Sequence, residues 1–67
     1  MKYPKVRGAI LEKYGTQASF AEALGIHAAT LNAKLCGRVD WTRQEVEKAG
    51  KLLGLTGEEL YTYFFNL

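Results

Sequence analysis

Apolar residues recur at intervals of three and four along the whole chain of 67 residues. Amphipathic helices show this spacing, whereas a half-buried strand would show strict alternation of apolar and polar residues. Glycine is well suited to end a helix, because the residue just past a helix end often has a left-handed conformation. Periodic stretches are followed by Gly15, Gly25, Gly37 and Gly54. These four stops predict five helices and an all-α fold.

Two of the predicted helices have strong start signals. Thr42 and Thr56 are each followed three residues later by a glutamate, Glu45 and Glu59. In this spacing the hydroxyl and the carboxylate each satisfy a backbone N–H at the helix start, an arrangement called a capping box. The five helices are expected over about 5–14, 16–24 and 27–36, from about 42 to 53, and from about 56 almost to the end of the chain.

Gly8 and Gly50 lie inside predicted helices, away from the stops. Each costs about 1 kcal/mol relative to alanine at an interior helical position. We interpret both as places where another helix approaches closely, with tolerated weakness as the alternative.

Length and composition exclude several classes of protein. A chain of 67 residues forms one domain, here 1–67, and leaves little room for a deep catalytic cleft. Cys36 and His27 are each the single residue of their type, so neither a disulfide framework nor a Cys/His zinc site can be assembled. We therefore expect no enzyme, no cofactor and no metal. The apolar runs are too short to cross a membrane, and a soluble protein of the bacterial cytoplasm, near the nucleoid, is expected.

Basic charge is concentrated in the first two-thirds of the chain. Residues 1–43 contain seven Lys or Arg and three Asp or Glu, whereas residues 44–67 contain two and four. Such an asymmetry favours a face directed at a polyanion, although a solvated basic surface would explain it equally well.

The segment 16–37, TQASFAEALGIHAATLNAKLCG, is the most informative stretch. Small Ala21 would allow two helices to cross closely, Gly25 would turn the chain, and Leu31 and Leu35 would face the core. This arrangement projects the second helix outward. With Gln17, Ala21 and Gly25 at intervals of four, the segment resembles the helix-turn-helix regulators of the Cro and phage-repressor class. The resemblance implies a compact five-helix, lambda-repressor-like domain, with the helix-turn-helix at helices two and three, that regulates transcription by binding an operator.

On this interpretation the third helix enters the major groove of double-stranded DNA. Its outward arc would place four residues against base edges: Ala28, Ala29, Asn32 and Ala33. Phosphate contacts would come from Gln17, Thr30, Lys34, Arg38 and Arg43. For Gln17 this role is implied by the resemblance, and a surface Asn32 would more often be merely solvated.

The third helix departs from this class at its first outward positions. Alanines stand there, so no arginine is available for a bidentate contact with guanine. The remaining candidates have structural explanations: His27 is expected to be a weak helix cap, Cys36 a small filler, and Trp41 a hydrophobic staple or the edge of the core.

Binding to DNA would require two copies on half-sites about 34 Å apart, so a homodimer is predicted. A dimer or partner surface would be formed by Tyr61, Tyr63 and Phe65, because the end of the chain is richer in apolar side chains than one short helix can bury. The alternative hypothesis is a phage antirepressor or modulator that uses the same scaffold to bind a repressor protein. The small, apolar Ala28, Ala29 and Ala33 favour this alternative, since such a face packs well against another helix.

Overall fold

The computed structural model describes residues 2–65 and contains five helices within them. Their bounds are α1 Pro4–Tyr14, α2 Gln17–Leu24, α3 Ala28–Leu35, α4 Arg43–Leu53 and α5 Gly57–Phe65. The predicted all-α, five-helix fold is confirmed, and the observed bounds differ from the predicted ones by at most one residue. The end of the fifth predicted helix falls on Asn66 and Leu67, which lie outside the described residues.

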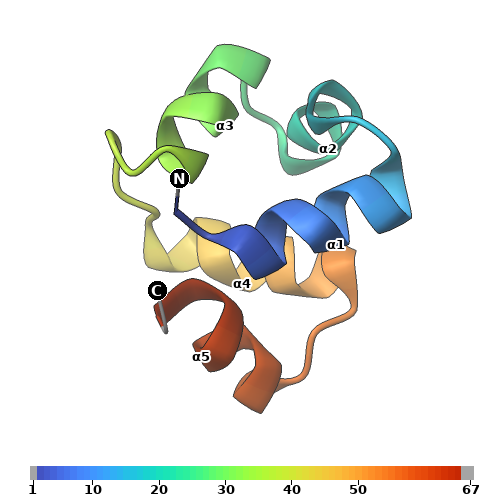
Figure 1. Cartoon of the computed structure of the whole chain (residues 1–67), viewed down its shortest axis with the longest axis vertical. Helices are drawn as coiled ribbons and strands as arrows, with labels where there is room; N and C mark the ends of the chain where they lie inside the picture. The colour runs from blue at the N-terminus through green and yellow to red at the C-terminus, as the bar shows by residue number, and fades with distance from the viewer. Residues whose placement is uncertain (1, 66–67) are drawn as a thin grey trace.

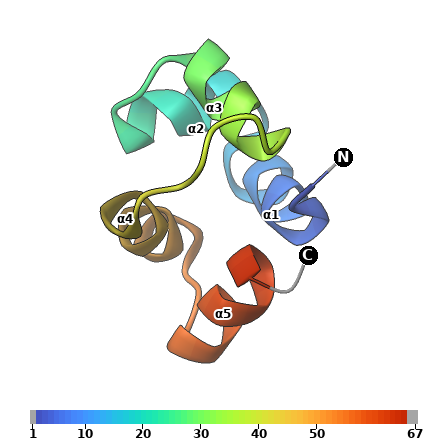
Figure 2. The same ribbon diagram turned by 90° about the vertical axis from the view of Figure 1, so that its left-hand side faces the viewer.

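The helices form three levels along the longest axis of the molecule. Figures 1 and 2 show α2 and α3 at one end, α5 at the other end, and α1 and α4 between them. Tyr3, just before α1, lies against Phe64 of α5 with ring centroids 6.3 Å apart, so the two ends of the described chain meet. None of the five described helices has the length and apolar character needed to cross a membrane.

All five helices contribute to one hydrophobic core. Each core residue is almost completely buried and lies on the inward stripe of its helix. The set comprises Val6, Ile10, Phe20, Ala21, Leu24, Leu31, Leu35, Val46, Ala49, Leu53 and Phe64.

Both predicted capping boxes are present. The Thr42 backbone N–H donates to Glu45 Oε1 at 2.8 Å, and the Glu45 N–H donates to Thr42 Oγ1 at 3.1 Å. Thr56 and Glu59 repeat the arrangement at 2.9 and 3.2 Å. His27 is the N-cap of α3 and makes no capping bond through its side chain.

The two helical glycines differ in their surroundings. A methyl group at Gly50 would overlap the Leu60 side chain, so the predicted close approach of α4 and α5 is confirmed there. At Gly8 no atom beyond its chain neighbours and its own helix backbone lies within 4 Å of where a Cβ would be, so the same interpretation is wrong for Gly8.

The turn between α2 and α3 is short, as its sequence predicts. Gly25 has φ 87° and caps α2, and the Ile26 N–H donates to the Ala21 carbonyl at 3.0 Å. Ala21 is buried where the helices approach, and Leu31 points into the core from α3. The opposite face of α3 is thereby turned to solvent.

Candidate functional site

The outward face of α3 is small and uncharged. Ala28, Ala29 and Asn32 are exposed, as the helical spacing predicted, whereas Thr30 and Ala33 are half-buried. All residues of α3 are described, and Lys34 is the single charged residue among them. The position of Lys34 therefore decides whether α3 can attract a polyanion.

Lys34 is buried, so the prediction that it contacts a phosphate from the helix surface is wrong. Only 4% of the residue is exposed. Its Nζ lies 2.8 Å from Glu45 Oε1 and donates to the Asp40 carbonyl at 2.9 Å. A buried ammonium must be paired and hydrogen-bonded, and these two oxygens meet that requirement within the chain.

The sequence contains a signal for this burial. Lys34 follows Leu31 by three residues and precedes Leu35 by one, which places it on the core-facing stripe of α3. The sequence did not identify Glu45 as the partner of Lys34, because Glu45 was assigned only to the capping box of α4. One carboxylate oxygen performs both tasks, accepting from Thr42 and from Lys34.

Glu45 is held in its charged form by these contacts. Burial alone would raise the pKa of its carboxyl group, but the hydrogen bonds from Lys34 and from the Thr42 backbone, together with the Lys34 charge, lower the pKa below its ordinary value. Glu45 is therefore ionised at neutral pH, and its contact with Lys34 ties α3 to the first turn of α4.

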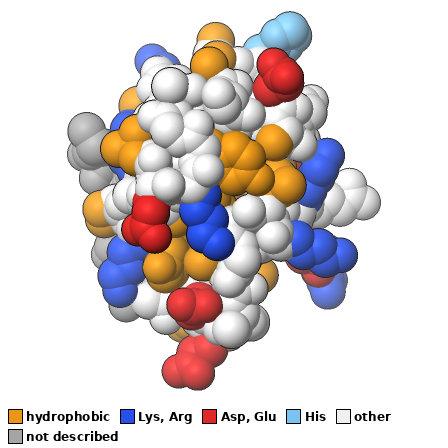
Figure 3. Space-filling model, turned by 90° about the vertical axis from the view of Figure 1, so that its right-hand side faces the viewer, with side chains coloured by type: hydrophobic (Ala, Val, Ile, Leu, Met, Phe, Trp, Pro, Cys, Tyr) orange, Lys and Arg blue, Asp and Glu red, His pale blue; other side chains and the backbone are white. Residues whose placement is uncertain are grey.

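The predicted phosphate contacts outside α3 lie on three different parts of the chain. Gln17 is half-buried at the first position of α2, and Arg38 is exposed in the segment after α3. Arg43 begins α4 and lies 3.6 Å from Glu47, in an ion pair that is open to solvent and therefore weak. On the face shown in Figure 3, acidic and basic side chains are mixed, with hydrophobic side chains between them.

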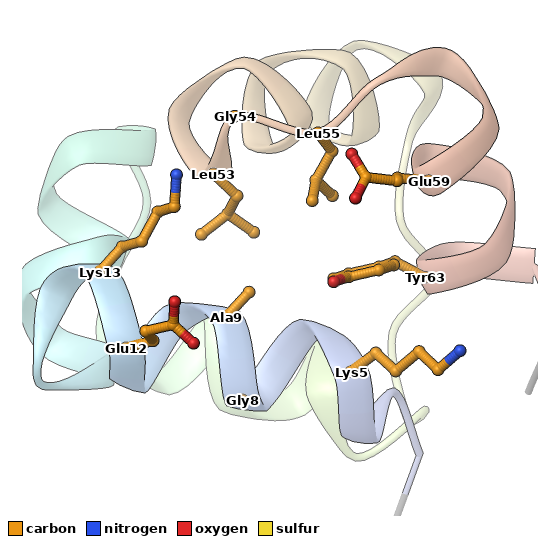
Figure 4. A pocket seen from close by; sticks show the side chains of 10 residues that line it. All are labelled: Lys5, Gly8, Ala9, Glu12, Lys13, Leu53, Gly54, Leu55, Glu59 and Tyr63. Atoms are coloured by element: carbon orange, nitrogen blue, oxygen red, sulfur yellow. The ribbon is translucent and has the colours of Figure 1, made fainter.

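The three aromatic residues predicted as one surface lie in two places. Tyr61 and Phe65 are 67% and 64% exposed and lie side by side on α5, with ring centroids 5.8 Å apart. Tyr63 is half-buried and lines a groove of about 540 Å³ between α1 and the α4–α5 turn. Figure 4 shows its ring extending from α5 into this groove. The prediction of a single surface is wrong for Tyr63. A helix turns by about 100° per residue, so Tyr63, which is two residues from both Tyr61 and Phe65, lies on the opposite side of α5.

Two adjoining grooves lie beside Phe65, along α4 and α5. A groove of about 470 Å³ is bounded by Trp41, Val46, Leu60 and Phe65, together with Arg43 and Glu47. A second groove, of about 360 Å³, shares Trp41, Val46 and Phe65 with it. We call these grooves, together with the exposed rings beside them, the aromatic surface, and define it by Trp41, Val46, Leu60, Tyr61 and Phe65.

The aromatic surface has the composition of a protein-binding site. Large exposed apolar side chains beside a preformed groove mark interaction surfaces, and aromatic residues contribute disproportionately to binding energy. Charged residues of both signs border the grooves: Glu47 and its ion-pair partner Arg43 line one, and Asp40 lines the other. Sequence reasoning found the two exposed aromatic residues of α5 but treated Trp41 as a structural residue alone. Trp41 is half-buried against the core and also forms a wall of both grooves.

Comparison with known proteins tests the family prediction. The model of the family described as "Protein of unknown function (DUF739)" matches residues 1–67. The chain belongs to this family. Its fold is similar to the solution structure of the modulator of repression (MOR) of the temperate bacteriophage TP901-1 from Lactococcus lactis, with a TM-score of 0.84 and 40% sequence identity. That match covers 97% of this chain and 88% of the other. A search of the curated proteins found no match.

These findings correct the family prediction. The chain is not a member of the Cro and phage-repressor class, and the prediction of a DNA-binding transcriptional regulator is wrong. Gln17, Ala21 and Gly25 reflect the geometry of a short turn between two helices: Ala21 is buried and Gly25 caps α2. Those requirements belong to the fold, and they do not determine what the outward helix binds. Neither the operator nor a homodimer on DNA is supported.

Proposed function

We propose that this chain is a modulator of phage repression that acts by binding a repressor protein. The observation that carries the proposal is the likeness to the TP901-1 modulator of repression, which extends over almost the whole length of both chains at 40% identity. Identity at this level, with the same fold throughout, favours a shared function far more than a shared fold alone does.

The electrostatics of α3 support a protein partner. A helix that enters DNA normally brings cations to the phosphates, which supply most of the non-specific affinity. Here the single cation of α3, Lys34, is neutralised inside the protein by Glu45. The exposed residues Ala28, Ala29 and Asn32 carry no charge that could replace it.

We place the repressor-binding site at the aromatic surface. Tyr61 and Phe65 provide exposed apolar area, and the grooves beside Trp41 provide a place for side chains of the partner. The charged residues that line the grooves, Asp40, Glu47 and Arg43, would form a polar rim around such an apolar contact.

Isothermal titration calorimetry with the purified repressor encoded in the same genome tests the proposal. We expect saturable binding of repressor with a weak dependence on salt, since apolar contacts respond little to ionic strength. A parallel fluorescence anisotropy series with the repressor's operator DNA should give only weak binding, lost as salt rises. Tight, sequence-selective DNA binding without any heat from the repressor would overturn the proposal.

A further inference from the structure

The ion pair of Lys34 is placed so that it fixes one residue of the aromatic surface. Trp41 lies between Asp40 and Thr42 in the segment that joins α3 to α4. The Asp40 carbonyl accepts from Lys34 Nζ at 2.9 Å, and the Thr42 N–H donates to Glu45 Oε1 at 2.8 Å. Both bonds end on the same ion pair, so the backbone is held immediately before and immediately after Trp41.

The indole ring itself is held by contacts of low directionality. Trp41 Nε1 is buried and donates no hydrogen bond to any residue of the described chain. The ring meets Phe64 edge-on at 5.0 Å and Tyr3 at 6.2 Å, and Lys34 Nζ lies 6.0 Å from its centroid. Apolar ring contacts tolerate sliding and rotation more readily than a hydrogen bond does, because they are less directional.

Stability alone does not explain a charged pair at this place. Replacing a buried ion pair with uncharged residues of similar volume is often neutral or stabilising. The Lys34 ammonium joins three parts of the chain: α3, the connecting segment and the first turn of α4. Its contacts therefore fix the relative positions of these parts more than they stabilise the fold. Trp41 then forms a wall shared by two grooves of the aromatic surface.

We propose that Lys34 is a positioning residue for repressor binding, which acts through Glu45 and the Asp40 carbonyl to hold Trp41 as the wall of the grooves between α4 and α5. This inference rests on the proposed function and adds to it a residue that does not touch the partner. Loss of the pair leaves the fold intact and allows Trp41 to move.

The double variant Lys34→Met with Glu45→Gln tests the role of the pair. Methionine keeps the volume and the apolar stem of the lysine, and glutamine keeps an oxygen that can accept from the Thr42 N–H in the capping box. No unpaired charge is left behind. A matched control is Lys13→Met with Glu12→Gln on α1, which makes the same change of charge at exposed positions.

Three readouts separate positioning from folding. We expect repressor affinity to fall about tenfold or more in the Lys34/Glu45 variant, while the urea midpoint stays close to that of the wild type. Acrylamide quenching of the single tryptophan in the free protein should increase about twofold or more, since a mobile indole is more accessible. The control variant should match the wild type in all three measurements.

The outcomes distinguish the two proposals. If the wild type binds the repressor and the Lys34/Glu45 variant binds equally well, Lys34 has no positioning role and the proposed function stands. If the wild type does not bind, both proposals fail. If the double variant does not fold, Lys34→Met alone serves, because the Glu45 side chain that it leaves is 23% exposed and still accepts from the Thr42 N–H. Unchanged quenching and unchanged affinity in that variant would refute the inference.

Discussion

Phe64 and Phe65 are neighbours in sequence and should respond to the same substitution in opposite ways. Phe64 is 3% exposed and packs against Trp41 and Tyr3, whereas Phe65 is 64% exposed. Phe64→Ala should lower the free energy of unfolding by about 3 to 5 kcal/mol, the usual cost of removing a buried phenylalanine. The free energy of unfolding of a domain of this size is only about 3 to 10 kcal/mol, so much of the variant should be unfolded at 25 °C.

Phe65→Ala should have little effect on folding and a large effect on binding. Its stability change should stay below about 1 kcal/mol, because most of the ring is already in water. The exposed part of the ring is roughly 100 Å², which corresponds to about 2 kcal/mol if the repressor covers it. Affinity should therefore fall roughly thirtyfold.

Urea denaturation followed by far-UV circular dichroism, with calorimetric titration of the repressor, measures both quantities. Leu11→Ala is a suitable control, because Leu11 is similarly exposed at 58% but lies on α1, outside the aromatic surface. The reasoning is refuted if Phe65→Ala loses as much stability as Phe64→Ala, or if it binds the repressor as tightly as Leu11→Ala does.

Two further predictions concern stability. Gly8→Ala should stabilise the protein by up to about 1 kcal/mol, because the helix gains propensity and the space is open, whereas Gly50→Ala should be destabilising by about 1 to 3 kcal/mol as the Leu60 side chain is displaced; equal urea midpoints for the two variants would contradict this difference. The pKa of Glu45 is lowered in the folded state. The stability that its carboxylate contributes is therefore complete above the ordinary pKa of a carboxyl group, and it is lost as the pH falls through the lowered pKa of the folded state. Between about pH 5 and pH 3 the wild type should therefore lose more stability than Glu45→Gln, and parallel losses in thermal melts over that range would show that the contacts of Glu45 with Lys34 do not matter.

The local signals of the sequence were reliable for the fold. Thr42 and Thr56 mark real helix starts, because a capping box needs only residues three positions apart. Gly25 ends α2 for an equally local reason, its left-handed backbone conformation. The outward direction of Ala28 and Ala29 follows from the burial of Leu31 and Leu35 on the opposite face.

Features that depend on contacts between distant residues were not predictable in the same way. The partner of Lys34 lies eleven positions along the chain, and nothing in the spacing selects Glu45 over another carboxylate. Gly8 and Gly50 have similar sequence surroundings, and only the packing of α5 distinguishes them. Function depends on the surface that the shared helical scaffold presents, and for this reason the helix-turn-helix spacing alone led to the wrong family.

Chemical-shift mapping tests the central claim most directly. The uniformly ¹⁵N-labelled chain would be titrated with unlabelled repressor, and the backbone and indole N–H signals followed. We predict large shifts at Trp41, Tyr61 and Phe65, with small ones along the outward face of α3. Shifts confined to Ala28, Ala29 and Asn32, or an unchanged spectrum at saturating repressor, would contradict the account.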